Sequence, residues 1–305
     1  MKVAIVGVGR VGATLAFLLV ERGIVDELVL VDADARVAEG EALDLVHAQA
    51  FTHHRTNVSA GSVEETAGSD IIVLACSAPW RGEYKSRFEL GRANMGIFRE
   101  LVPVLAERSP GAKMLVISNP ADVMTYHTLR LSGFGWERVF GTGTLIDSAR
   151  FRMLLSRALG IHPDDVRAYI LGEHGETQFP EFSLAVVGGT RIVDDAGTRA
   201  LFRETTRAGF EVVERKGHTS YAISMAAALV IEAIALDTRR TMPLSVLVDG
   251  YLGVRDVCLS LPVVVGRSGI VRVLYPELSG EEAAAFRRCA EVVRAGIDET
   301  LGGGG

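Results

Sequence analysis

The beginning of the chain holds the pattern that most restricts what it can fold into. A short β-rich run at residues 3–6 leads directly into Gly7-Val8-Gly9-Arg10-Val11-Gly12, and a helical pattern of apolar residues follows. The next apolar run, residues 28–31, ends in Asp32, which lies 20 residues after Gly12. A strand, a G-x-G-x-x-G turn, a helix, a second strand and an acidic residue at this spacing are typical of a dinucleotide-binding unit.

Each glycine of this turn has a physical role in such a unit. Gly7 allows the tight turn, Gly9 lets the backbone approach a pyrophosphate, and Gly12 allows the helix to pack closely on the strand. The N-terminus of the helix then receives the phosphates. Asp32 can accept hydrogen bonds from the ribose hydroxyls, and its charge would repel a 2′-phosphate, so we expect NAD rather than NADP. The residues expected to bind the cofactor are Gly7, Gly9, Arg10, Val11, Gly12 and Asp32.

Composition limits the class of protein. The chain has 305 residues, of which 48% are hydrophobic, so we expect one large domain or two closely packed domains with a sizeable core. A net charge of −6 argues against nucleic acid or an anionic membrane as the main partner. Three widely spaced cysteines form neither a disulfide framework nor a zinc pattern. No stretch reads as a signal peptide or a membrane span, so we expect a reduced, cytoplasmic compartment.

The order of the apolar runs predicts the fold class. After Asp32, helices are expected at residues 35–49, 87–108 and 122–132, and strands at 56–59, 70–76, 113–118 and 138–140. With the two strands before them, these give six strands alternating with helices, the pattern of a doubly wound parallel sheet of the Rossmann type. Later helices are expected at 145–159, 197–215, 219–237 and 280–301, and strands at 166–171, 184–187, 191–193, 246–248, 257–261 and 270–274. We therefore predict an α/β protein with an NAD-binding domain at residues 1–142 and an α+β substrate domain at residues 143–305, packed directly on the first.

A histidine at a strand end is the first candidate for catalysis. His174 lies in Leu171-Gly172-Glu173-His174-Gly175-Glu176, directly after the apolar run 168–171. Loops at strand ends often carry the chemistry of α/β enzymes, and a histidine pKa of about 6.5 permits proton exchange near neutral pH. We infer no metal site, because the pattern offers no partner to His47, His53, His54, His127 and His162.

Five motifs in their order along the chain resemble those of the NAD-dependent L-lactate and L-malate dehydrogenases, from Met1 to about Leu301. They are the glycine turn with Asp32, Ser-Asn-Pro-Ala-Asp at 118–122, Gly-Thr-Gly-Thr-Leu-Ile-Asp-Ser-Ala-Arg at 141–150, Gly-Glu-His-Gly at 172–175 and Lys-Gly-His-Thr-Ser-Tyr at 216–221. The resemblance implies hydride transfer between a nicotinamide and a small 2-hydroxy or 2-keto acid.

The resemblance also implies a role for individual residues. His174 matches the histidine that gives a proton to the 2-keto oxygen or takes one from the hydroxyl, and Asp147 matches the acid that orients its imidazole. Arg150 matches the arginine that holds the substrate carboxylate, and Arg87 the loop arginine that polarises the carbonyl. Asn119 matches the asparagine at the carbonyl end of the site and is also expected near the cofactor. A protonated base and a cation aimed at the oxygen lower the barrier to ketone reduction, because negative charge develops there.

The loop before the long helix departs from both branches of the family. In this loop, lactate dehydrogenases carry a glutamine and malate dehydrogenases an arginine that reads the far end of the substrate. Counted back from Arg87, Arg81 takes that position and favours a second carboxylate, as in malate. Counted forward from the strand at 70–76, Trp80 takes it and favours an apolar side chain, as in lactate or a branched 2-hydroxy acid. Thr219 is similar to the lactate branch, so we expect a lactate-type enzyme.

Two further arginines raise the question of an effector. Arg152 and Arg167 match positions that form a fructose 1,6-bisphosphate site at a subunit interface in many bacterial lactate dehydrogenases, although arginine replaces the usual histidine at 167. Activation by a sugar bisphosphate is one hypothesis, and plain surface charge is the other. The resemblance also implies a homo-oligomer, either a dimer or a tetramer.

The function we expect is that of an NAD-dependent L-2-hydroxy acid dehydrogenase of the lactate dehydrogenase type. Two alternatives within this class stay open, a malate dehydrogenase in which Arg81 reads the second carboxylate and a branched-chain L-2-hydroxy acid dehydrogenase. The alternative from another class is a catalytically silent NAD-binding regulatory protein. The intact set of His174, Asp147 and Arg150 argues against that last hypothesis.

Overall fold

A computed structural model of the protein describes residues 1–79 and 87–301, and at residues 87 and 88 the backbone alone. The helices are α1 Arg10–Arg22, α2 Ala35–Ala48, α3 Arg87–Arg108, α4 Ala121–Ser132, α5 Leu145–Leu159, α6 Ala196–Lys216, α7 Tyr221–Ala235 and α8 Gly280–Leu301. The strands are β1 Lys2–Val6, β2 Glu27–Val31, β3 Asn57–Ala60, β4 Ile71–Leu74, β5 Lys113–Val116, β6 Val139–Gly141, β7 Val166–Leu171, β8 Phe179–Val187, β9 Thr190–Arg191, β10 Arg240–Asp249, β11 Arg255–Gly266 and β12 Gly269–Val273. Among the described helices, none is both long and apolar enough to cross a membrane.

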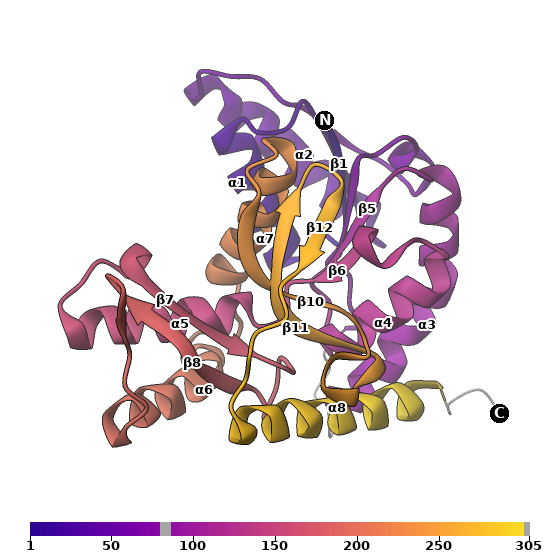
Figure 1. Cartoon of the computed structure of the whole chain (residues 1–305). Coiled ribbons are helices and arrows are strands. Elements are labelled where there is room, and N and C mark those ends of the chain that lie inside the picture. The colour runs from indigo at the N-terminus through magenta and orange to yellow at the C-terminus, as the bar shows by residue number, and fades with distance from the viewer. Residues whose placement is uncertain (80–86, 302–305) are drawn as a thin grey trace.

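Six parallel strands form the framework of the first part of the chain (Figure 1). Their order is β3-β2-β1-β4-β5-β6, with β1 hydrogen-bonded to β2 on one side and to β4 on the other. The chain adds β2 and β3 on one side of β1 and then β4, β5 and β6 on the other side. The point at which the strand order reverses therefore lies between β1 and β4. In sheets of this kind ligands bind outside the carboxyl ends of the strands at such a reversal. The α/β fold with a doubly wound parallel sheet that the sequence predicts is confirmed.

Strand β1 shows why the sheet is a rigid base for its edge loops. Val3 and Ile5 pack with residues of α1 and α7, whereas Ala4 and Val6 pack with residues of α3 and α4. All four side chains are buried. Because both faces of the sheet are covered, its strands are nearly continuous apolar runs instead of alternating ones.

The second part of the chain extends this sheet as well as packing on it. Strand β11 is antiparallel to both of its neighbours, β10 and β12, and β10 joins β6 through the antiparallel pair Ser245 and Gly141. The sequence predicts only residues 246–248 as a strand because Pro243 interrupts the apolar pattern. In the structure Pro243 lies opposite Pro262 of β11, and the hairpin continues past both. The sheet and one apolar core run through both parts, and the expected domain boundary at residue 142 stays a prediction.

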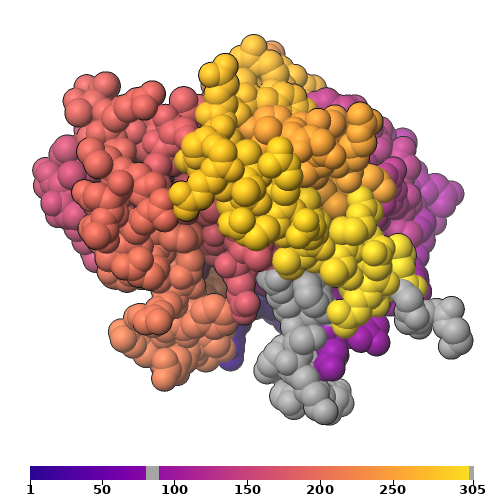
Figure 2. Space-filling view, turned by 60° about the horizontal axis from the view of Figure 1, so that its bottom comes forward, coloured from indigo at the N-terminus to yellow at the C-terminus, as the bar shows by residue number. Residues whose placement is uncertain are grey.

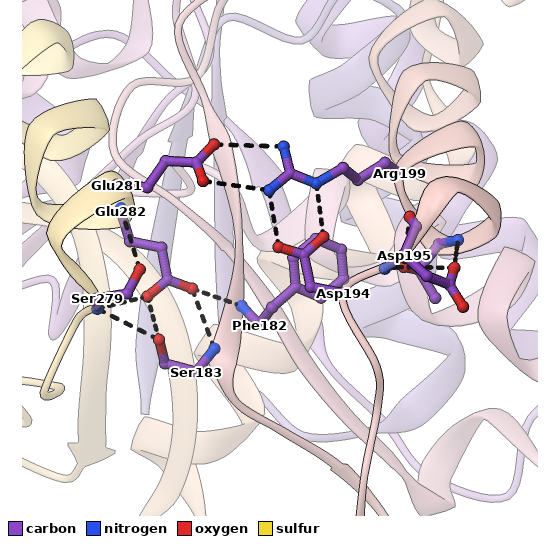
Figure 3. A network of polar contacts seen from close by, with 9 residues as sticks. Phe182, Ser183, Asp194, Asp195, Arg199, Ser279, Glu281 and Glu282 are labelled. Carbon is purple, nitrogen blue, oxygen red and sulfur yellow. Dashed lines mark hydrogen bonds and ion pairs between the residues drawn. The ribbon is translucent and has the colours of Figure 1, made fainter.

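A lobe outside the large sheet contains β7, β8 and β9 with α5 and α6, and α8 packs against both this lobe and the large sheet. Figure 2 shows α8 in yellow on one face of the molecule, beside the pink and orange segments of this lobe. Buried Glu282 in α8 accepts a hydrogen bond from the Ser183 amide of β8 at 3.0 Å. Arg199 of α6 donates to Asp194 at 2.6 Å and to Glu281 of α8 at 3.3 Å (Figure 3).

Candidate active site

Three glycines shape the turn between β1 and α1. Gly7 has a φ of +96°, and a Cβ on it would lie 2.4 Å from the backbone nitrogen of Cys76. A Cβ on Gly12 would lie 2.0 Å from the carbonyl oxygen of Gly7, so helix and turn touch there. A Cβ on Gly9 would meet no described atom within 4 Å, which leaves open space at the N-terminus of α1. The turn therefore fits a dinucleotide pyrophosphate, which needs close approach to backbone N–H groups at a helix start.

Asp32 lies directly after β2, beside this turn. Its Oδ2 accepts a hydrogen bond from the Val8 amide at 2.9 Å, and its Oδ1 accepts one from the Asp34 amide at 3.1 Å. A carboxylate has about four acceptor positions, so both oxygens can still accept from ribose hydroxyls. Arg10 at the start of α1 is exposed and Val11 is half-buried. The free acceptor positions of Asp32 fit ribose hydroxyls, and the assignment of these residues to the cofactor stays a prediction.

The loop after β7 holds His174 through its backbone. Gly172 pairs with Ser260 of β11, because its N–H donates to the Ser260 carbonyl at 3.1 Å and its carbonyl accepts from the Ser260 N–H at 2.8 Å. The His174 N–H then donates to Oδ2 of Asp122 at 2.7 Å. Asp122 lies in the first turn of α4 and is 3% exposed. Strand β11 and helix α4 thus each hold the backbone of this loop, at Gly172 and at His174.

The imidazole of His174 is held by a second carboxylate. Its Nδ1 lies 2.5 Å from Oδ2 of Asp147, which belongs to α5. The other oxygen of Asp147 accepts from Nη1 of Arg150 at 3.1 Å. Asp147 is 3% exposed, whereas the side chains of His174 and Arg150 are 27% and 21% exposed. The carboxylate therefore stands behind a histidine and an arginine that both reach open space.

These contacts set the protonation of the group. Burial alone would lower the pKa of His174, but the charge and hydrogen bond of Asp147, with Asp122 adding to them, raise it above the usual value. Burial would raise the pKa of Asp147, but His174 and Arg150 outweigh it and lower that pKa. Both shifts favour the pair of an imidazolium and a carboxylate over the neutral pair. With Nδ1 engaged by Asp147, Nε2 is the nitrogen that can exchange a proton with a ligand.

Helix α6 closes the side of the site next to Arg150. A Cβ on Gly209 would lie 3.2 Å from Nη1 of Arg150, so the guanidinium lies directly against the helix backbone. Thr219 lies in the short connection between α6 and α7 and is half-buried. The sequence singles out Thr219 but gives no signal for Gly209, because a glycine within a helical pattern has no characteristic spacing.

Asn119 ends the loop after β5 and is exposed in this structure. Its carbonyl oxygen accepts from Nδ2 of buried Asn94 at 2.7 Å, and Oδ1 of Asn94 accepts from the Ala78 amide at 2.7 Å. Asn94 thereby joins the loops after β4 and β5. Neither Asn94 nor Asp122 is assigned a role by the sequence. Asn94 shows no signal, whereas Asp122 stands in the Ser-Asn-Pro-Ala-Asp motif three residues after Asn119.

Three expected residues have no described side chain. Trp80 and Arg81 lie outside the described residues, and Arg87 is described only as the first residue of α3. The choice between Trp80 and Arg81 as the reader of the substrate's far end stays open. Within residues 1–79 and 87–301, no three His, Cys, Asp or Glu side chains are grouped closely enough to hold a metal ion.

Comparison with known families and proteins matches both parts of the chain. The family described as lactate/malate dehydrogenase, NAD binding domain, matches residues 1–141, and lactate/malate dehydrogenase, alpha/beta C-terminal domain, matches residues 144–302. The chain is 40% identical to an L-lactate dehydrogenase of Synechococcus sp., covering 98% of this chain and 99% of the relative. It is also 40% identical to an L-lactate dehydrogenase of Gloeobacter violaceus, covering 98% and 93%.

Solved structures of similar fold are also lactate dehydrogenases. A lactate dehydrogenase from a Medee basin deep-sea metagenome library is similar with a TM-score of 0.94 and 32% identity, covering 98% of both chains. The minor L-lactate dehydrogenase of Enterococcus mundtii is similar with a TM-score of 0.93 and 31% identity, covering 97% of both chains. The family resemblance seen in the sequence motifs is confirmed.

Proposed function

This chain belongs to the lactate/malate dehydrogenase family, and we propose that it reduces pyruvate to L-lactate with NADH through His174. It is an NAD-dependent oxidoreductase acting on the CH–OH group of a 2-hydroxy acid. The observation that carries the residue assignment is the contact of Asp147 with both His174 and Arg150. That contact brings a histidine and an arginine to one carboxylate, which supports their proposed roles as proton donor and carboxylate-binding cation.

In this proposal the β1–α1 turn and Asp32 would hold NADH, which would supply the hydride for the substrate carbon. His174 donates the proton from Nε2 to the carbonyl oxygen, because Asp147 holds Nδ1 on the opposite side of the ring. The raised pKa of His174 favours the protonated form that reduction requires. Asp147 stabilises the imidazolium before transfer and keeps the ring oriented after it.

The substrate is oriented by cations in this proposal. Arg150 grips the carboxylate with the guanidinium N–H groups that do not contact Asp147, since a planar guanidinium pairs with a carboxylate through two parallel hydrogen bonds. Arg87 polarises the carbonyl from the start of α3, and Asn119 lies at the carbonyl end of the site. Thr219, in the connection between α6 and α7, is proposed as a further substrate contact, because it is similar to the lactate branch at that position.

Steady-state oxidation of NADH with pyruvate, oxaloacetate and 2-ketoisocaproate tests the proposal. We expect the highest kcat/KM with pyruvate. A higher value with oxaloacetate that Arg81→Gln reverses would establish the malate alternative with Arg81 as its selector. A higher value with 2-ketoisocaproate would establish the branched-chain alternative. NADH binding without oxidation by any of the three would favour the silent regulatory protein.

An anion site at Arg152 and Arg167 is part of the proposal. Nε of Arg152 is buried without a hydrogen-bond partner among the described atoms, and the charges of Arg167 and Arg240 add to burial in lowering its pKa. A cluster of cations with an unpaired donor favours a phosphorylated effector. The idea fails if fructose 1,6-bisphosphate changes neither the half-saturating pyruvate concentration nor the oligomeric state. A homo-oligomer, dimeric or tetrameric, and a cytoplasmic location are likewise proposed from the family.

A further inference from the structure

Asp122 is a buried carboxylate that the reaction outlined above does not use. It is 3% exposed, and both of its carboxylate oxygens accept hydrogen bonds. Oδ2 accepts from the His174 backbone N–H at 2.7 Å, and Oδ1 accepts from Oγ of Ser245 at 2.6 Å. Ser245 belongs to β10 and is fully buried. The carboxylate therefore joins α4, β10 and the loop of His174.

His174 is thus held by two carboxylates from different parts of the chain. Asp147 of α5 contacts the ring, and Asp122 of α4 contacts the backbone of the same residue. Asp122 also lies three residues after Asn119, in the turn that is expected to face the substrate carbonyl. A shift of the Asn119–Asp122 segment relative to the His174 loop would therefore move His174 relative to the substrate carbonyl that it is proposed to protonate.

A neutral side chain could hold the backbone of His174 equally well. An amide oxygen accepts an N–H bond as a carboxylate does, at a much smaller cost of burial. Burial raises the pKa of Asp122 to about 6, with Ser245 and the His174 N–H opposing that rise, so the group is charged near neutral pH. The groups whose charges or dipoles act on it are His174, Glu173, Ser245, Cys258 and Cys289. Holding the backbone of His174 therefore does not by itself explain why this buried side chain carries a negative charge.

We propose that Asp122 is a positioning residue, whose buried carboxylate fixes the backbone of His174 and whose negative charge favours the protonated, proton-donating imidazole. The charge acts together with Asp147 and against the nearby cation Arg150. The assignment of a donating role to His174 rests on the proposed function. The effect on the imidazole's protonation can be measured without any substrate.

Titration of the His174 imidazole by NMR is the first test, in the full-length wild type and in Asp122→Asn. The resonance is identified by its loss in His174→Asn. In Asp122→Asn the amide oxygen can still accept from the His174 N–H, and the NH₂ group can donate to Oγ of Ser245. We expect the His174 pKa to fall by about one unit, because only the opposite charge is removed.

Glu181→Gln is the matched control for this titration. Glu181 is also 3% exposed, carries a raised pKa of about 7 and accepts from the Leu184 amide in β8. Its replacement removes one buried, titratable carboxyl group away from the His174 loop, so the His174 titration is expected to stay at its wild-type value. An unchanged His174 titration in Asp122→Asn, or an equal fall in Glu181→Gln, overturns the proposal.

The pH profile of pyruvate reduction is the second test. Because reduction requires the protonated imidazole, the alkaline limb of kcat/KM should move to lower pH in Asp122→Asn by the same amount as the titration. Asp122→Ala also removes the acceptor of the His174 N–H, so we expect its kcat to fall by roughly 10–100-fold even at the pH optimum. Asparagine should restore most of that loss. Equal kcat in the alanine and wild-type proteins would exclude the positioning role.

The two tests separate this inference from the function on which it rests. A wild type that does not reduce pyruvate, together with a lowered titration in Asp122→Asn, contradicts the proposed function and supports the effect of Asp122 on His174. A wild type that reduces pyruvate, with an unmoved alkaline limb in Asp122→Asn, contradicts the inference alone.

Discussion

Two groups of charged residues link distant elements of this protein, and they differ in burial. Around His174, the carboxylates of Asp147 and Asp122 are each 3% exposed. In the contacts that tie α6 to α8, Arg199 is 46% exposed and Glu281 is 73% exposed (Figure 3). Exposed ion pairs contribute little to stability because water and salt screen them, whereas buried charges are costly and are retained where their position matters. Burial, more than the number of ion pairs, distinguishes the carboxylates around His174 from the contact between Arg199 and Glu281.

The largest expected effect is that of His174→Asn. Removal of the proton donor should lower turnover with pyruvate by roughly 10²–10⁴-fold, the usual contribution of a general acid. NADH binding, measured by fluorescence titration, should stay close to the wild-type affinity because the β1–α1 turn is unchanged. Turnover equal to that of the wild type would remove His174 from the mechanism.

The next effect concerns the free energy of unfolding. It compares the buried charge of Asp122, which is costly, with the exposed charges of Arg199 and Glu281, which are not. The pKa of Asp122 is raised in the fold from 3.8 to about 6, so the fold prefers its protonated form. The favourable contribution of the protonated Asp122 carboxyl to the free energy of unfolding is fully present below pH 3.8. It is lost as the pH rises through 6. At about 1.4 kcal/mol per pH unit, the buried charge costs on the order of 3 kcal/mol at pH 8.

Urea unfolding of wild type and Asp122→Asn at pH 8 and at pH 4.5 measures this cost. The variant should be the more stable protein at pH 8, by up to about 3 kcal/mol, and its advantage should shrink at pH 4.5. A variant that is less stable than the wild type at pH 8 would mean that the carboxylate is retained for stability and not for its effect on His174.

A smaller effect is expected for Arg150→Lys, which keeps the charge beside Asp147 but loses the planar pair of donors. We expect kcat/KM for pyruvate to fall by roughly 10–100-fold, mainly through a higher KM. The thermal midpoint should change little, because lysine can still pair with Asp147. An unchanged KM would show that Arg150 supports Asp147 and does not bind the substrate carboxylate.

The smallest effect is expected for Arg199→Ala in the exposed network. The thermal midpoint should fall by no more than about 3 °C, and by less at high salt, because exposed ion pairs are screened. Pyruvate reduction should match that of the wild type at all pH values. A loss of activity comparable to that of Arg150→Lys would show that the surface network also positions the site, and the contrast between the two regions would fail.

The sequence alone determined the features that depend on short separations along the chain. The G-x-G-x-x-G turn with Asp32, the alternation of strands and helices, and the helix at residues 145–159 that carries Asp147 and Arg150 are all written within a few turns of the backbone. Local patterns of this kind predict the fold class, the cofactor and the family. They did not predict that β10 continues the sheet beyond β6, since strand partners distant in sequence leave no local pattern.

The tertiary structure alone decided which polar groups meet at Asp122. His174 contacts Asp122 across 52 residues, and Asp122 contacts Ser245 across a further 123. Such contacts depend on how the large sheet brings α4, β10 and the loop after β7 to one edge, and no spacing in the sequence encodes that geometry. The glycine turn predicts the nucleotide and the family motifs predict Asp147 beside His174, but only the folded structure shows that a second buried carboxylate, Asp122, holds the same histidine.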